Sequence, residues 1–150
     1  MKVGILTQPL HTNYGGLLQA YALQTVLKRL GHDVTIINRC YPKAQGSILS
    51  KLLNLKNIIL GRNAICYDKR KISFVEDNTS RFIKKNYTLT EPFYTTESLK
   101  EHILQNKFDA IIVGSDQVWR PRYSPNIYNY FLDFAEDKET KRYSYAASFG

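Results

Sequence analysis

The sequence predicts an α/β fold in which helices flank a parallel β-sheet. Residues 1–40 contain an apolar run, a polar loop, an amphipathic segment, a glycine and a second apolar run. A third apolar run, DAIIVG, follows another helical pattern later in the chain. The composition, 43% hydrophobic and 23% charged, is typical of a globular protein. Because parallel strands are joined by helical crossovers, this order of segments predicts a Rossmann-like sheet.

The first strand–helix–strand unit has the clearest pattern. The run VGIL, residues 3–6, is typical of a buried parallel strand. An amphipathic helix is expected from about Gly16 to Leu30, followed by a left-handed cap at Gly31 and the strand VTIIN. The apolar positions of that helix recur every three to four residues and are expected to face the sheet: Leu17, Tyr21, Leu23, Val26, Leu27 and Leu30.

Residues 41–88 interrupt this alternation with a basic helical insertion. Residues 39–85 hold 11 Lys and Arg but 3 Asp and Glu, and they account for the whole net charge of +8. Two helices are expected here, one over ILSKLLNLKNIIL (residues 48–60) and one over about 68–85. The charge fits either a solvated helix face or a surface for an anionic partner.

The α/β pattern resumes with a helix from Thr96 or Glu97 to about Asn106. Its buried side is expected to hold Leu99, Ile103 and Leu104. The strand DAIIVG, residues 109–114, follows and is apolar throughout, as in a strand that is covered on both faces.

Two shorter segments complete the expected sheet. YFLDF, residues 130–134, fits a short strand or extended segment, and RYSYAASFG, residues 142–150, fits the last strand. The 150 residues fit one domain. A strand that ends in small residues usually continues into a helix, so we expect a C-terminal domain that this chain does not include.

Ligands of open parallel sheets bind at the carboxyl ends of the strands. Three such ends can be placed, at residues 7–16, 114–119 and 148–150. Glycines at a helix start allow close backbone approach, and the free N–H groups there attract phosphate or carboxylate. The glycine pair also fits a plain turn, since the loop matches neither GxGxxG nor Walker A. The first-loop residues that we expect to contact substrate are Gln8, His11, Asn13, Tyr14, Gly15 and Gly16.

The second loop, GSDQVW (residues 114–119), follows a buried strand. Asp116 is placed there to orient a hydroxyl or to act as a general base. Ser115 and Gln117 can hydrogen-bond a sugar, and Trp119 offers an apolar ring face. A second interpretation is that Ser115 or Asp116 caps a short helix and that Trp119 only packs.

Several kinds of site are not indicated. No cluster of His, Cys and carboxylates has metal-ligand spacing, so we expect no metal and no cofactor. Cys40 and Cys66 lack CxxC spacing, and we expect both to be reduced and structural. No apolar run is long enough to span a membrane, and the first strand begins directly after Met-Lys, without a signal peptide. We therefore expect a cytoplasmic protein.

Three blocks of sequence resemble one protein family, in the family's order. TQPLHTNYGGLLQAYALQTVLKRLGHDVTIIN, residues 7–38, resembles the opening of the polysaccharide pyruvyl transferases, with an N-x-G-G-type loop and a helix that contains LQAYAL. DAIIVGSDQVW (109–119) and RYSYAASFG (142–150) are similar to two further blocks of that family.

The resemblance implies the N-terminal half of a GT-B-type transferase, in which two Rossmann-like domains enclose a cleft. Such enzymes move the pyruvyl unit of phosphoenolpyruvate to a sugar of a polysaccharide or its lipid-linked precursor, close a ketal and release phosphate. The donor-associated arginine and histidine of the family lie largely in the C-terminal half. This implies that the present domain supplies the acceptor side, with Asp116 acting on a hydroxyl, and that it is inactive without its C-terminal partner domain.

Other functions stay open at this point. A non-catalytic sugar-nucleotide or glycan-binding module is the alternative to an enzyme. The basic insertion, with Leu52 and Leu55 beside Lys51 and Lys56, would suit peripheral contact with anionic lipid at the inner face of the membrane. Nucleic acid is not expected as a partner, because no helix-turn-helix or RNA-binding motif occurs. An exposed interdomain face would favour a homo-oligomer.

Overall fold

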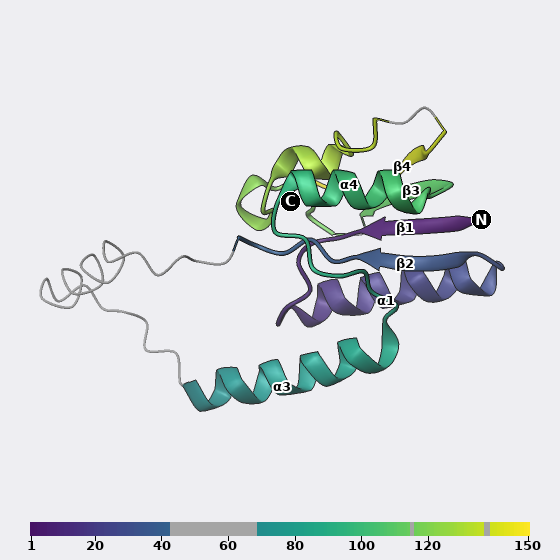
Figure 1. Ribbon diagram of the computed structural model, residues 1–150. Coiled ribbons are helices and arrows are strands. Elements are labelled where there is room, and N and C mark those ends of the chain that lie inside the picture. The colour runs from purple at the N-terminus through teal and green to yellow at the C-terminus, as the bar shows by residue number, and fades with distance from the viewer. Residues whose placement is uncertain (43–68, 115, 137–138) are drawn as a thin grey trace, which may run out of the picture.

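The computed structural model of the chain describes residues 1–42, 69–114, 116–136 and 139–150 (Figure 1). It contains a four-stranded sheet in the order β2-β1-β3-β4, with every pair of strands parallel. The strands are β1 (Lys2–Leu6), β2 (Asp33–Ile37), β3 (Ala110–Gly114) and β4 (Lys141–Tyr145). The predicted α/β fold with a parallel sheet is therefore confirmed. The expected helix at 48–60, Cys66 and Ser115 lie outside the described residues.

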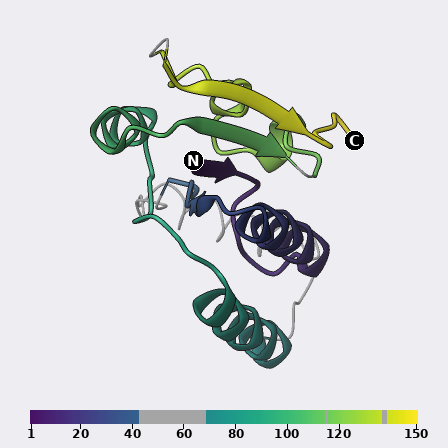
Figure 2. The ribbon, with the colours of Figure 1, turned by 90° about the vertical axis from the view of Figure 1, so that its right-hand side faces the viewer.

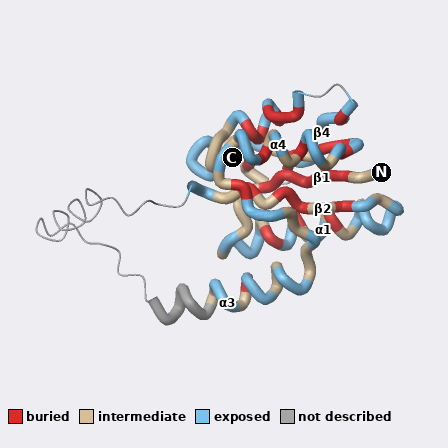
Figure 3. Tube along the Cα trace, viewed as in Figure 1, coloured by how far each residue is buried: buried red, intermediate tan, exposed pale blue. Residues whose placement is uncertain are grey.

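Two hydrophobic clusters cover the two faces of the sheet, as the alternation of side chains along the strands requires. Val3 and Ile5 belong to the cluster on one face, with Val34, Ile36 and Ala110 of the neighbouring strands. Leu6, Ile37, Ile111 and Val113 belong to the cluster on the other face. Figure 3 shows that the buried residues concentrate on the central strands. In contrast, all five residues of the edge strand β4 are exposed.

The helices lie on opposite sides of this sheet (Figure 2). Helix α1 (Tyr14–Arg29) connects β1 to β2, and its Leu23 and Leu27 pack on the Val3 cluster. Helix α4 (Thr96–Asn106) packs Leu99 and Ile103 on the Leu6 cluster of the other face. Helix α3 (Lys69–Asn86) forms an outer layer on α1, where the rings of Phe82 and Tyr21 meet edge-on at 5.7 Å between centroids.

The ends of α1 follow local capping rules. The Asn13 Oδ1 atom accepts a hydrogen bond from the Gly16 N–H at 3.2 Å, which satisfies one of the free donors of the first turn. Gly31 follows the last turn with φ +84°, a conformation that glycine adopts without steric cost. The helix therefore begins two residues before the predicted start at Gly16.

The face of α1 that meets the sheet agrees with the predicted one at Leu23 and Leu27 but not at Val26 and Leu30. Leu17, Ala20 and Gln24 are buried, whereas Val26 and Leu30 are 52% and 67% exposed. The fully buried row 17–20–24 includes the polar Gln24, which a pattern of apolar residues alone does not predict. Leu104 of α4 is also exposed rather than buried, because Leu99 and Ile103 already fill that side of the helix.

Gln24 makes a specific bridge from α1 to the segment that follows α3. Its Nε2 atom donates to the Asn86 carbonyl at 2.9 Å, and its Oε1 atom accepts from the Thr88 N–H at 3.0 Å. Because the Gln24 side chain is buried, its replacement by methionine removes both bonds and leaves two backbone groups without this partner. We expect Gln24→Met to lower the free energy of unfolding by about 1–3 kcal/mol in urea titrations.

Gln19 provides the matched control, since it lies on the same helix and is exposed. Gln19→Met is expected to change the free energy of unfolding by less than about 0.5 kcal/mol. Equal changes for the two variants would contradict the bridging role of Gln24.

Residues 130–134 form no strand, contrary to the prediction. A 3₁₀ segment, η2 (Ile127–Phe131), is followed by Leu132 in a left-handed conformation with φ +59°. The alternate residues Tyr130, Leu132 and Phe134 are indeed buried, but a 3₁₀ turn produces the alternation. The last predicted strand also ends early, at Tyr145, because Ala146 has φ +49°.

No helix among the described residues has the length and apolar character needed to cross a bilayer.

Candidate functional site

The loops that follow the parallel strands meet at one edge of the sheet. The loop after β1 is joined to the loop after β3 by a hydrogen bond from Gln8 Nε2 to the Gln117 carbonyl, at 2.9 Å. The segment after β4 is joined to the same loop, because the Ser148 N–H donates to the Asp116 carbonyl and the Trp119 N–H donates to the Ser148 carbonyl, both at 3.1 Å. The three predicted strand ends therefore form one continuous surface.

The Asp116 carboxylate lies against the first turn of α1. A Cβ atom added at Gly16 would be 3.0 Å from Asp116 Oδ2 and 3.2 Å from Asn13 Nδ2. Gly16 thus leaves room for the carboxylate and for the amide of Asn13 on the same side of the helix start. The other carboxylate oxygen, Oδ1, accepts from the Gln117 N–H at 2.7 Å. Since the first turn of α1 has no acidic residue of its own, Asp116 supplies the negative charge that a helix N-terminus favours.

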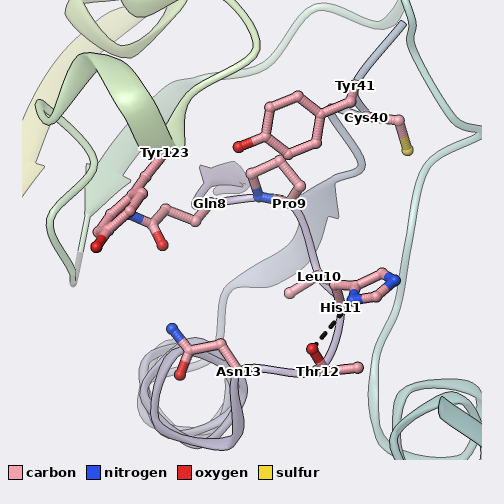
Figure 4. A pocket seen from close by; sticks show the side chains of 9 residues that line it. All are labelled: Gln8, Pro9, Leu10, His11, Thr12, Asn13, Cys40, Tyr41 and Tyr123. Atoms are coloured by element: carbon pink, nitrogen blue, oxygen red, sulfur yellow. Dashed lines mark hydrogen bonds between the residues drawn. The ribbon is translucent and has the colours of Figure 1, made fainter. Parts of the chain in front are cut away.

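A pocket of about 720 Å³ opens beside the loop after β1 (Figure 4), and Asp116 is not among the residues that line it. Three segments form its walls. They are the loop after β1, residues Cys40 and Tyr41 in the segment that follows β2, and η1 (Pro121–Tyr123). The volume is within the range of small-molecule sites. The residues that line it are Gln8, Pro9, Leu10, His11, Thr12, Asn13, Cys40, Tyr41 and Tyr123.

A buried polar network holds two of the three segments that form the pocket, the loop after β1 and the residues after Arg39. Arg39, 3% exposed, donates from Nε to Asn129 Oδ1 at 3.0 Å and from Nη1 to the carbonyls of Cys40 and Phe93 at 2.7 and 3.1 Å. The buried Tyr130 hydroxyl donates to the Thr7 carbonyl at 3.2 Å, where the first loop begins. Burial lowers the pKa of the Arg39 guanidinium, which nevertheless stays charged at neutral pH. This network fixes the end of β2 and the start of the first loop relative to each other.

Comparison with known families identifies the chain. The family model described as polysaccharide pyruvyl transferase matches residues 13–150.

The chain belongs to the polysaccharide pyruvyl transferase family.

A search among curated proteins found no match. The family match includes Asn13, Gly16 and Asp116, but it begins after Gln8 and His11. The contacts of the Asp116 carboxylate with the start of α1 therefore lie wholly within the part that is shared with the pyruvyl transferase family.

The site brings together some of the residues that the sequence indicates and separates others. Gln8, His11 and Asn13 line the pocket, and His11 Nε2 also lies 3.6 Å from a Glu76 carboxylate oxygen of α3. Tyr14 instead borders a hollow between α1 and α3, with Leu17, Leu18 and Phe82. Gly15 and Gly16 form the first turn of α1. Ser115 lies outside the described residues.

Trp119 and Gln117 have partners within the protein. The Trp119 indole N–H donates to the Tyr130 carbonyl at 2.9 Å, and its ring is stacked on Phe131 with centroids 5.6 Å apart. Phe149 approaches the same ring at 5.2 Å, in a tilted arrangement. Gln117 Oε1 accepts from Arg120 Nη1 at 3.0 Å. These contacts give both side chains a packing role at the edge of the site.

Sequence reasoning missed the two tyrosines of the pocket. Tyr41 follows the end of β2, which is also a carboxyl end of a parallel strand, so the same rule would have found it. Tyr123 enters through η1, after the loop that follows β3, and only the tertiary structure places it opposite the first loop.

Within the described ranges, no group of three or more His, Cys, Asp or Glu is placed to hold a metal ion.

Proposed function

We propose that this chain is the acceptor-side domain of an enzyme that transfers a pyruvyl group from phosphoenolpyruvate to a sugar of a polysaccharide or of its lipid-linked precursor. The observation that carries the proposal is the Asp116 carboxylate, which lies against Gly16 on the same side as the amide of Asn13, a residue of the pocket lining. A carboxylate at this place can accept the proton of a sugar hydroxyl. The family of the chain supports a transferase.

The reaction requires the following balance of bonds. One sugar hydroxyl oxygen bonds to C2 of phosphoenolpyruvate, and the methylene carbon takes up a proton to become a methyl group. A second hydroxyl oxygen of the same sugar then bonds to C2, while the C2–O bond to phosphate breaks. Of the two hydroxyl protons released, one balances the proton gained by carbon and the other leaves with phosphate. A group that accepts hydroxyl protons, such as Asp116, is therefore needed on the acceptor side.

The charge of the pocket supports an acceptor rather than a donor site. Phosphoenolpyruvate carries a carboxylate and a phosphate, which require cations or several N–H donors. Among the described residues that line the pocket, none is Lys or Arg. We therefore place the donor on the partner domain of a two-domain enzyme, and we propose a cytoplasmic enzyme that needs no metal or cofactor in this domain.

The direct test is phosphate release from phosphoenolpyruvate by the full-length protein with a panel of acceptor glycans. Release that depends on the acceptor is expected, since phosphate leaves only when the second hydroxyl has bonded. Absence of release with a glycan that nevertheless binds saturably would contradict the enzyme and support a glycan-binding module instead.

A further inference from the structure

The pocket combines two aromatic side chains with a largely apolar lining that also carries neutral polar groups. Tyr41 and Tyr123 approach it from separate segments and are 50% and 42% exposed, so their rings are accessible from solvent. Figure 4 shows Tyr41 beside Pro9 on one side of the pocket and Tyr123 beside Gln8 on the other. His11 is the one imidazole of the lining, and no Asp, Glu, Lys or Arg contributes within the described residues. The pocket therefore suits an uncharged, polar group with an apolar face.

Tyr123 is held by a contact of its own ring, and Tyr41 is positioned through the backbone of the residue before it. Cys40, just before Tyr41, is fixed by the bond from Arg39 to its carbonyl and by its own N–H, which donates to the Phe93 carbonyl at 2.8 Å. The Arg120 guanidinium lies over the Tyr123 ring, 4.8 Å from its centroid, and so covers part of that ring. Burial raises the pKa of the Tyr41 phenol, which at its ordinary value is already neutral at physiological pH.

Two amide groups of the lining, those of Gln8 and Asn13, face the pocket from opposite sides (Figure 4). The Gln8 amide is oriented by its Nε2 bond to Gln117, which leaves Oε1 as an acceptor. The Asn13 amide is oriented by its Oδ1 bond to Gly16, which leaves Nδ2 as a donor. In Figure 4 the Gln8 oxygen and the Asn13 nitrogen both point into the pocket. An acceptor and a donor that face the same pocket suit hydroxyl groups, which both donate and accept.

We propose that Tyr41 and Tyr123 are the aromatic walls of the acceptor-sugar subsite and determine its affinity for the sugar ring. A pyranose ring presents C–H groups on its faces and hydroxyls at its rim. It thus packs its apolar face on tyrosine while rim hydroxyls bond to Gln8 Oε1 and Asn13 Nδ2. This proposal rests on the proposed function for the identity of the ligand, but the rings and the amides are properties of the pocket itself.

The test compares Tyr41→Ala and Tyr123→Ala in the full-length protein with the matched control Tyr128→Ala. Tyr128 is 67% exposed on η2 and is not among the residues of the pocket. At saturating phosphoenolpyruvate, each pocket variant is expected to raise the acceptor KM about tenfold, since stacking and burial of one ring face are lost. The KM for phosphoenolpyruvate should not change. Tyr41→Phe and Tyr123→Phe should restore most of the affinity, because the ring remains.

A second measurement separates this proposal from the reaction. Saturation-transfer difference NMR is recorded without phosphoenolpyruvate, with methyl glycosides of hexoses and N-acetylhexosamines as probes. Transfer to ring protons that disappears in the alanine variants, but not in Tyr128→Ala, is expected. This result would support the subsite even if no phosphate were released, in which case only the enzymatic proposal fails. Unchanged acceptor KM in both alanine variants of an active enzyme, or no transfer to any glycoside, would overturn the subsite.

Discussion

Replacement of Asp116 by asparagine is expected to lower acceptor-dependent phosphate release by about 10²–10⁴-fold in kcat/KM, the contribution typical of a positioned general base. Asparagine keeps the size of the side chain and an oxygen that can accept from the Gln117 N–H, but it cannot take up a hydroxyl proton. The measurement is phosphate release over a range of acceptor concentrations at saturating phosphoenolpyruvate. Loss in kcat with little change in acceptor KM would show that the carboxylate acts on the reaction rather than on binding.

Asp109→Asn is the matched control for this substitution. Asp109 lies just before β3, at the opposite end of the strand from Asp116, and its Oδ2 accepts from the Lys2 N–H at 2.6 Å. Its replacement should leave kcat/KM unchanged. If Asp116→Asn were as active as the control, the carboxylate would serve only to bind the Gln117 N–H.

Gly16→Ala tests the placement of the same carboxylate without removing it. The added methyl group would be 3.0 Å from Asp116 Oδ2, closer than ordinary contacts, so the carboxylate must shift. We expect a fall in kcat of about tenfold, which corresponds to a modest loss of positioning. Gly15→Ala is the control, because its nearest side-chain atom, Asn13 Oδ1, is at 3.4 Å.

The fold was predictable because the central strands carry continuous apolar runs with glycine-rich or polar boundaries. Residues 3–6, 34–38 and 109–114 predict β1, β2 and β3 to within one residue at each end. The strand predicted at residues 130–134 is absent. Alternate residues there, Tyr130, Leu132 and Phe134, are buried as in a strand, but a 3₁₀ turn and a left-handed Leu132 produce this alternation. Local pattern alone does not distinguish the two, because tertiary packing decides which residues are buried.

The site was predictable only as far as the position of strand ends is predictable. The rule for parallel sheets predicts that the loops with Gln8, Asn13 and Asp116 meet, and the hydrogen bonds between those loops confirm that they do. The contact of Asp116 with Gly16 depends on the twist of the sheet and has no signal in the sequence. Arg39 was counted with a basic segment, although it is almost fully buried. A charged residue directly after an apolar strand is a weak hint of burial, and only the structure shows its partners.

Arg39→Met is expected to lower the free energy of unfolding by about 2–4 kcal/mol, a large part of the stability of an ordinary domain. Three oxygen atoms converge on the guanidinium, from Asn129, Cys40 and Phe93. Asn129 Oδ1 also accepts from the Thr96 hydroxyl, and the Phe93 carbonyl also accepts from the Cys40 N–H. The Cys40 carbonyl loses the side-chain donor that fixes it. Urea titration at neutral pH measures the change in the free energy of unfolding. An m-value equal to that of the original chain would show that the shift in midpoint reports stability alone.

Two opposing effects decide the sign of this result. A buried guanidinium costs free energy of desolvation, and an apolar replacement of similar length removes that cost. The desolvation of Arg39 is already offset by three hydrogen bonds, and methionine would place a thioether that donates no hydrogen bond against these three oxygens. The loss of three hydrogen bonds, one of which leaves the Cys40 carbonyl without its side-chain donor, therefore outweighs the gain, and the variant is destabilised. Stability equal to that of the original chain would show that water replaces the guanidinium in the network.

Arg39→Lys and Arg122→Met complete the comparison. Lysine keeps the charge but cannot reproduce the fixed fork that reaches Asn129 and two carbonyls at once, so it should recover only part of the lost stability. Arg122 is an exposed residue of η1, and its replacement should change the free energy of unfolding by less than about 0.5 kcal/mol. Because Arg39 also holds the backbone of Cys40 and thereby the Tyr41 wall, Arg39→Lys should raise the acceptor KM while leaving the KM for phosphoenolpyruvate unchanged. Stability and acceptor affinity would then fall together at one buried residue that does not line the pocket.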